Sequence, residues 1–199
     1  MPDDRAGREE QARDRENRQR RREVLEELER SDESEPPVDD AELDALDVEL
    51  DSVEFPATGL ELVEAVGYQE VESAAGTHEL AELLPRTDRE RYESASAVRV
   101  RVRRPRIATA MKRIVEAADE FQSAELGTSQ YEAYERTLRA LKAIEEDDED
   151  EGIEVLTDWI VEYIREEERT PGSRDVRRRA AEFCRSNGYE VGSDEWLGV

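Results

Sequence analysis

The fold is decided by the stretch Ile153-Glu154-Val155-Leu156-Thr157-Asp158-Trp159-Ile160-Val161-Glu162-Tyr163-Ile164, which carries the strongest periodic signal in the chain. Its apolar side chains recur every three or four residues, so they share one face of an α-helix. The same pattern recurs in segments 107–118, 131–141 and 173–187. Asn187-Gly188 is a suitable end for the last of these. We therefore predict a mainly α-helical protein, with a C-terminal helical part over residues 128–199.

A small helical module is predicted over residues 55–122. Thr58 and Thr77 are suitable N-caps for two short helices. Gly67 and Pro85 are suitable residues to end those helices. The run Val98-Arg99-Val100-Arg101-Val102 has the alternation of a strand, whereas its flanks favour a helix. A short strand near 98–102 and a helix over the same residues both remain open.

Residues 1–54 are predicted to be a charged arm and linker that is disordered or partly helical. The first 35 residues contain few large apolar side chains, too few to offset the entropy of ordering the segment. Pro36-Pro37 marks a linker. Segment 39–54 is acidic without a basic residue, although three leucines are spaced like one helix face: Leu43, Leu46 and Leu50. We expect the folded part to begin near Phe55.

The composition is strongly acidic. The 199 residues include 54 Asp and Glu against 29 Lys and Arg, which gives a formal net charge of −25. Only Lys112 and Lys142 are lysines, and the other basic residues are arginines. An acid-rich, lysine-poor surface is typical of cytoplasmic proteins in salt-accumulating cells, where molar salt screens charge repulsion over about 3 Å. We therefore predict a halophilic, cytoplasmic protein.

Several classes of site are excluded by the residues available. Cys184 is the only cysteine, so neither an intrachain disulfide nor a cysteine zinc site can form. No apolar run approaches the length of a membrane-spanning helix, and the first residues lack the apolar region of a secretory signal. The chain contains no nucleotide-binding glycine motif. His78, the only histidine, is predicted to be an exposed residue of a short helix, and Cys184 an inert core thiol. We therefore expect no catalytic residue, cofactor or metal.

Three short motifs stand in one part of the chain: Phe55-Pro56-Ala57-Thr58, Leu83-Leu84-Pro85, and Tyr92-Glu93-Ser94-Ala95 with Val98. Together they resemble a small domain of unknown function that has an F-P-A-[ST] start, an L-L-P centre and a Y-x-S-x-x-x-V end. The whole chain also looks like an uncharacterised haloarchaeal family ending in P-G-S-R-D-V-R-R-R-A and W-L-G. The resemblance implies a compact, mainly helical module and brings no known activity or site residues.

The segment 99–113 is basic in an otherwise acidic chain. It contains no acid and seven positive residues: Arg99, Arg101, Arg103, Arg104, Arg106, Lys112 and Arg113. Such asymmetry suggests a binding patch for nucleic acid or for an acidic partner. Arginine suits phosphate because its guanidinium group can bond two oxygens at once. The alternative is that these residues neutralise carboxylates of the protein itself.

The last predicted helix is also rich in arginine: Arg174, Arg177, Arg178, Arg179 and Arg185. Arg174, Arg178 and Arg185 share a face broadly opposite its apolar side chains. A short helix that carries arginines outward could enter a nucleic-acid groove. Its first turn lacks Asn and Gln, so we do not expect it to read sequence. The alternative is a solvated helix face.

The run from 145 to 151 consists of seven acids and is followed by Gly152. An EF-hand calcium-binding loop would have at its positions 1, 3, 5, 6 and 12 the residues Asp147, Glu149, Glu151, Gly152 and Asp158. The match is poor, because the bidentate Glu at the last position is missing. We expect a solvated acidic linker.

The leading functional hypothesis is a non-catalytic binding or adaptor protein, associated with nucleic acid or the ribosome through its arginine-rich segments. The alternative is a protein–protein module that docks acidic partners. An enzyme of unknown class comes third. The sequence indicates no small-molecule substrate and no membrane partner.

Overall fold

The computed structural model describes residues 38–74, 76–144, 147 and 150–189. It is mainly helical, as predicted. The helices are α2 (Asp40–Leu50), α3 (Gly59–Val66), α4 (Leu80–Leu83), α5 (Ala95–Val102), α6 (Pro105–Asp119), α7 (Thr128–Lys142), α8 (Glu151–Glu167) and α9 (Ser173–Asn187). The short strands are β1 (Ala57–Thr58), β2 (Glu70–Ser73), β3 (Gly76–Glu79) and β4 (Arg91–Tyr92). The predictions for residues 1–37 lie outside the described residues.

The packed part of the chain begins before residue 55. Helix α2 buries Leu43, Leu46 and Leu50 in the same core as α3, α4 and α5. Arg99 of α5 pairs with two of its acids, since it contacts Asp47 and lies 3.2 Å from Asp44. The expectation that the folded part begins near Phe55 is therefore corrected. The charge that stabilises α2 comes from a helix that is distant in sequence.

Truncation of a leucine in α2 tests this correction. Leu50 is 1% exposed, so Leu50→Ala should lower the free energy of unfolding by about 2–5 kcal/mol because it leaves a cavity. Val48 in the same helix is 68% exposed, so Val48→Ala serves as the matched control and should change that free energy by less than about 0.5 kcal/mol. Urea unfolding measures both. Equal, small effects would show that α2 does not belong to the folded core.

The three motifs of the small module meet at one place. Thr58 caps α3, as predicted, because its hydroxyl accepts a hydrogen bond from the Glu61 amide at 3.2 Å. Strand β1 pairs antiparallel with β4, so Ala57 faces Tyr92. A Cβ atom at Gly59 would collide with the carbonyl oxygen of Pro85. The start of the motif set thus pairs with its end, and Gly59, which follows the start, lies close to its centre.

A β-hairpin replaces the beginning of one predicted helix. Strands β2 and β3 pair antiparallel, and α4 begins only at Leu80. Gly76 has a φ of +124°, which favours glycine and reverses the chain. Val71 is the one buried residue of β2. The predicted cap at Thr77 is wrong because Thr77 lies within β3; Glu79 is the N-cap residue instead.

The segment 98–102 is helical. Val98 and Val102 are buried on one face of α5, whereas Val100 is 67% exposed. A strand would place all three valines on the same side. The helix alternative is therefore correct, and the strand alternative is wrong.

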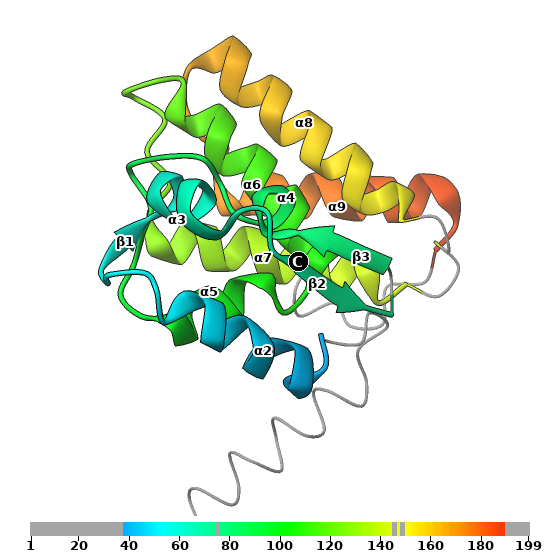
Figure 1. The fold of residues 1–199 in the computed structure, drawn as a ribbon. Helices are drawn as coiled ribbons and strands as arrows, with labels where there is room; N and C mark the ends of the chain where they lie inside the picture. Colours follow the sequence, from blue (N-terminus) through cyan, green and yellow to red (C-terminus); the bar gives the residue numbers. More distant parts are fainter. Residues whose placement is uncertain (1–37, 75, 145–146, 148–149, 190–199) are drawn as a thin grey trace, which may run out of the picture.

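The described residues form two apolar cores that share one helix. The first core is formed by residues between Val38 and Ala108, and the second by residues of α6, α7, α8 and α9 with the adjoining loops. Helix α6 contributes Ala108 to the first core, and Met111 and Ile114 to the second. Figure 1 shows α8 alongside α6 in the upper part of the view and α2 beside α5 in the lower part. Both arginine-rich segments therefore lie on helices whose positions are fixed by packing.

Candidate binding surface

The arginines of α5 are turned toward carboxylates of the protein. Arg99 joins α5 to α2 through Asp44 and Asp47. Arg101 is only 9% exposed and contacts Glu90 just before β4. Its Nε donates a hydrogen bond to the Tyr92 hydroxyl at 3.2 Å, and its guanidinium carbon lies 4.2 Å from the centre of the Tyr131 ring. Arg101 therefore connects the small module to α7.

Burial perturbs the charged groups around Arg101. It lowers the pKa of Arg101 to about 10, so the guanidinium group remains charged at neutral pH. It also raises the pKa of Glu90 to about 7. A hydrogen bond with the Tyr92 side chain lowers the pKa of Glu90, so burial and hydrogen bonding have opposite effects on this carboxyl. Glu90 Oε2 is buried and has no hydrogen-bond partner among the described residues.

The remaining positive residues of segment 99–113 are also engaged. Arg103 and Arg104 each make a polar or electrostatic interaction. Arg106 lies 3.3 Å from Asp150, and Arg113 lies 2.5 Å from Asp158, so both join α6 to the α8 region. Lys112 donates to the carbonyl of Ala81 at 2.6 Å. The segment therefore supports the alternative in which its positive charges neutralise carboxylates of the protein itself.

The arginines of α9 have a different environment. Val176, Ala180 and Cys184 are buried, as the sequence pattern predicts, and Gly188 ends the helix with a φ of +74°. Arg174 and Arg185 are exposed and Arg177 is half-buried. Within the described part of the chain, none of these three forms an ion pair with a carboxylate.

Two further arginines of α9 are paired only within the helix. Arg178 lies 2.7 Å from Asp175 and is 68% exposed, and Arg179 lies 3.7 Å from Glu182. Exposed ion pairs of this kind contribute little stability. The four residues Arg174, Arg177, Arg178 and Arg185 are called the α9 arginine face below.

Two of the three described positions of the acidic run, Asp147 and Asp150, do not lie in a solvated linker. Asp147 is buried and its carboxylate accepts hydrogen bonds from the amides of Glu151 and Gly152, at 2.9 and 2.8 Å. Asp150 is also buried, lies 2.5 Å from Lys142 and has a left-handed φ of +59°. The expectation of a solvated linker is therefore wrong for Asp147 and Asp150, because backbone amides and cations of other helices hold them. Glu149 lies outside the described residues.

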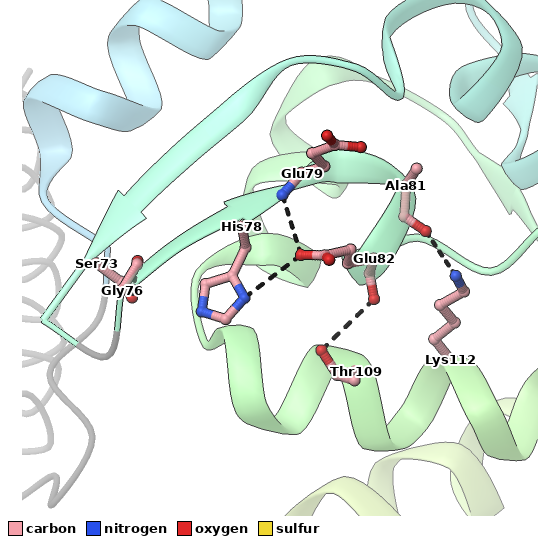
Figure 2. Close-up of polar contacts among 8 residues, drawn as sticks. All are labelled: Ser73, Gly76, His78, Glu79, Ala81, Glu82, Thr109 and Lys112. Carbon is pink, nitrogen blue, oxygen red and sulfur yellow. Dashed lines mark hydrogen bonds and ion pairs between the residues drawn. The ribbon is translucent and has the colours of Figure 1, made fainter.

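His78 lies on β3 and not on a helix. Figure 2 shows its Nδ1 facing Glu82, at 3.8 Å, and the Glu82 carboxylate also accepting a hydrogen bond from the Glu79 amide. The side chain is mostly buried, so the prediction of an exposed helix residue is wrong. Figure 2 also shows Thr109 and Lys112 of α6 donating to carbonyls of α4, at 3.5 and 2.6 Å. These contacts fix α4 onto α6, and the contact between His78 and Glu82 joins β3 to α4.

The described residues contain no group of three or more His, Cys, Asp or Glu that could hold a metal ion. Burial raises the pKa of the Cys184 thiol, which disfavours the reactive thiolate. No described helix is both long enough and apolar enough to cross a membrane.

The contact between Glu90 and Arg101 was not predictable from sequence, because no local pattern relates two residues on separate elements.

Residues 40–112 match the model of a family of unknown function, DUF5789. The match begins with α2 and ends within α6, so it includes the helix that lies in the predicted arm. The resemblance to a domain of unknown function is confirmed over this segment. No curated protein and no solved structure matches the chain.

Proposed function

We propose that the protein is a non-catalytic binding protein that contacts nucleic-acid phosphates through the α9 arginine face. The proposal rests on one observation: Arg174, Arg177 and Arg185 form no ion pair with any carboxylate that the structure describes. In a chain with 54 acids and 29 bases, intramolecular partners are abundant. A cation that stays exposed and unpaired in such a chain is available to an anionic ligand.

Phosphate is favoured over an acidic protein as this ligand. The exposed large apolar residues among those described are Val48, Tyr68 and Val100, and none of them belongs to α9. Protein–protein interfaces usually centre on apolar and aromatic side chains. A guanidinium group forms paired hydrogen bonds with phosphate oxygens, and these do not require an apolar surround.

High salt limits how such a surface works. The net charge of −25 repels a polyanion in dilute buffer. Molar salt screens that repulsion, but it also removes the counter-ion release that strengthens ordinary phosphate binding. Bidentate arginine geometry must therefore supply the affinity. This fits an adaptor of a salt-rich cytoplasm, associated with RNA such as that of the ribosome.

The experiment compares the wild type with Arg174→Gln, Arg178→Gln and Arg185→Gln combined. Binding of duplex and single-stranded RNA and DNA is measured at about 0.2 and about 2 M KCl. We expect the variant to lose most of its affinity. We also expect the dependence of log affinity on log salt to fall by up to about 0.9 per lost duplex contact, or about 2 to 3 in total.

The control combines Arg86→Gln, Arg165→Gln and Arg169→Gln, which removes three exposed arginines outside α9. This control should bind as the wild type does. Failure of the wild type to bind any nucleic acid would reject the proposal. Equal losses in both triple variants would show that net charge, and not the α9 arginine face, determines binding. Capture of acidic proteins in place of nucleic acid would favour the alternative adaptor function.

A further inference from the structure

The α9 arginine face contains a straight row of three exposed arginines. Arg174, Arg178 and Arg185 lie within about 40° of one another around the helix axis, because an α-helix has about 3.6 residues per turn. The row extends about 17 Å along the axis, at about 1.5 Å per residue. Such a row matches a regular series of phosphates better than it matches a single small anion.

Helix α9 is too deeply embedded to enter a deep groove. It packs against both α7 and α8, and it buries Val176, Ala180, Ala181 and Cys184. Only its outer side is therefore available to a ligand. The major groove of B-form DNA is about 8.5 Å deep, so a helix that reads it must project from the protein. The minor groove of A-form RNA is wide and shallow and presents phosphates and 2′-hydroxyls at its surface, where an embedded helix can reach them.

The aromatic side chain of α9 lies away from the arginine row. Phe183 is about 140° around the helix axis from Arg178. Its ring faces α8, since a Cβ atom at Gly152 would lie 2.9 Å from it, and it also packs against Tyr189. Proteins that bind single strands usually stack the bases on exposed aromatic side chains. Helix α9 offers no such side chain beside its arginine row, so a duplex suits the row better than a single strand does.

Helices α7 and α9 run side by side in the same direction. At their starts, Gln130 of α7 donates a hydrogen bond to the carbonyl of Pro171, just before α9, at 2.7 Å. Toward their ends, both helices meet the beginning of α8. Lys142 of α7 lies 2.5 Å from Asp150, and Phe183 of α9 packs against the first turn of α8. Residues that are equally far from the two starts therefore lie at similar heights.

Arg136 of α7 and Arg178 of α9 are such a pair. Arg136 is six residues after Gln130, and Arg178 is seven residues after Pro171. Arg136 is exposed and forms no ion pair with a carboxylate in the described part of the chain. The axes of packed helices are about 8–10 Å apart, so one duplex can contact both side chains.

We propose that the nucleic acid bound by the α9 arginine face is double-stranded RNA, and that Arg136 of α7 belongs to the same binding surface, an inference that rests on the proposed function and narrows its ligand. The arginines contact phosphates along the edge of the shallow groove, and no side chain reads the bases. Binding therefore depends on the shape of the duplex and not on its sequence.

The first test compares four probes of equal length with the full chain at about 0.2 and about 2 M KCl. They are two RNA duplexes of unrelated sequence, a DNA duplex with the sequence of one of them, and a single RNA strand. We expect the two RNA duplexes to bind equally, and the other two probes to bind at least about tenfold more weakly.

Other results of this comparison separate the two proposals. If the single strand or the DNA duplex binds as tightly as the RNA duplexes, or if one RNA sequence is strongly preferred, the duplex RNA proposal is overturned and the phosphate-binding role of the α9 arginine face stands. If none of the four probes binds, the proposed function is rejected, and the narrower proposal falls with it.

The second test concerns Arg136. Arg136→Gln should weaken binding of the RNA duplexes roughly three- to tenfold, and should lower the dependence of log affinity on log salt by up to about 0.9. Arg86→Gln is the matched control, since Arg86 is also exposed but follows α4 in the small module, and it should bind as the wild type does. Equal binding by Arg136→Gln and the wild type, or equal losses in the two variants, would overturn the assignment of Arg136 to the surface.

Discussion

Replacing Arg101 with leucine should lower the free energy of unfolding by about 3–5 kcal/mol, because it leaves a buried carboxylate without its counter-ion. Arg101 is 9% exposed and its partner Glu90 is mostly buried. The substitution also removes the hydrogen bond to Tyr92 and the contact with the Tyr131 ring. Since Tyr131 belongs to α7, the loss should weaken the junction between the small module and the C-terminal helices. Urea unfolding measures the effect.

The double variant Glu90→Leu, Arg101→Leu distinguishes the loss of the ion pair from the cost of leaving one charge buried and unpaired. Apolar replacement of both partners removes the uncompensated charge, so the double variant should be more stable than Arg101→Leu alone. Arg165→Leu is the matched control, since Arg165 forms an exposed pair with Glu120 at 3.3 Å and should contribute less than about 1 kcal/mol. A loss of similar size for Arg101→Leu and Arg165→Leu would contradict this account.

The melting midpoint should rise by about 10 °C or more between dilute buffer and about 2 M KCl. A net charge of −25 makes the folded chain repel itself, and molar salt screens that repulsion. The ion pairs of Arg99, Arg101 and Asp150 are partly or fully buried, so salt should weaken them less than it weakens the repulsion between exposed acids. Thermal unfolding followed by circular dichroism gives the midpoint.

A variant with fewer acids provides the control. Glu162 and Glu166 are exposed on α8, so Glu162→Gln with Glu166→Gln should raise the midpoint in dilute buffer and have a smaller effect in about 2 M KCl. A midpoint that stays flat or falls with salt in the wild type would reject the prediction that the acidic composition is an adaptation to salt.

Local patterns predicted the features that depend on neighbouring residues. The helical spacing of apolar residues located α6 to α9, and the Thr58 cap and the Gly188 terminus followed from residue type. The hairpin was missed because Val71 is the only buried residue of β2, and one residue is too few for a detectable alternation.

Other features depend on partners that are distant in sequence. Asp44 and Asp47 of α2 pair with Arg99, and Asp150 pairs with Arg106 and Lys142. In the sequence, the arginines of these ion pairs are visible as the charge asymmetry of segment 99–113. That asymmetry was compatible with internal pairing and with an external ligand, and only three-dimensional contacts distinguish the two.

The position of α6 in both cores has a consequence for any protein that contains the matched segment alone. The family match ends at residue 112, within α6, shortly before that helix buries Ile114 among the C-terminal helices. Ile107 and Met111 lie inside the matched segment, yet they are covered by helices that lie outside it. A relative that contains only the matched segment would therefore leave an apolar strip of α6 uncovered. Such a relative would need another helix or a second subunit in the place that α7 and α8 occupy here.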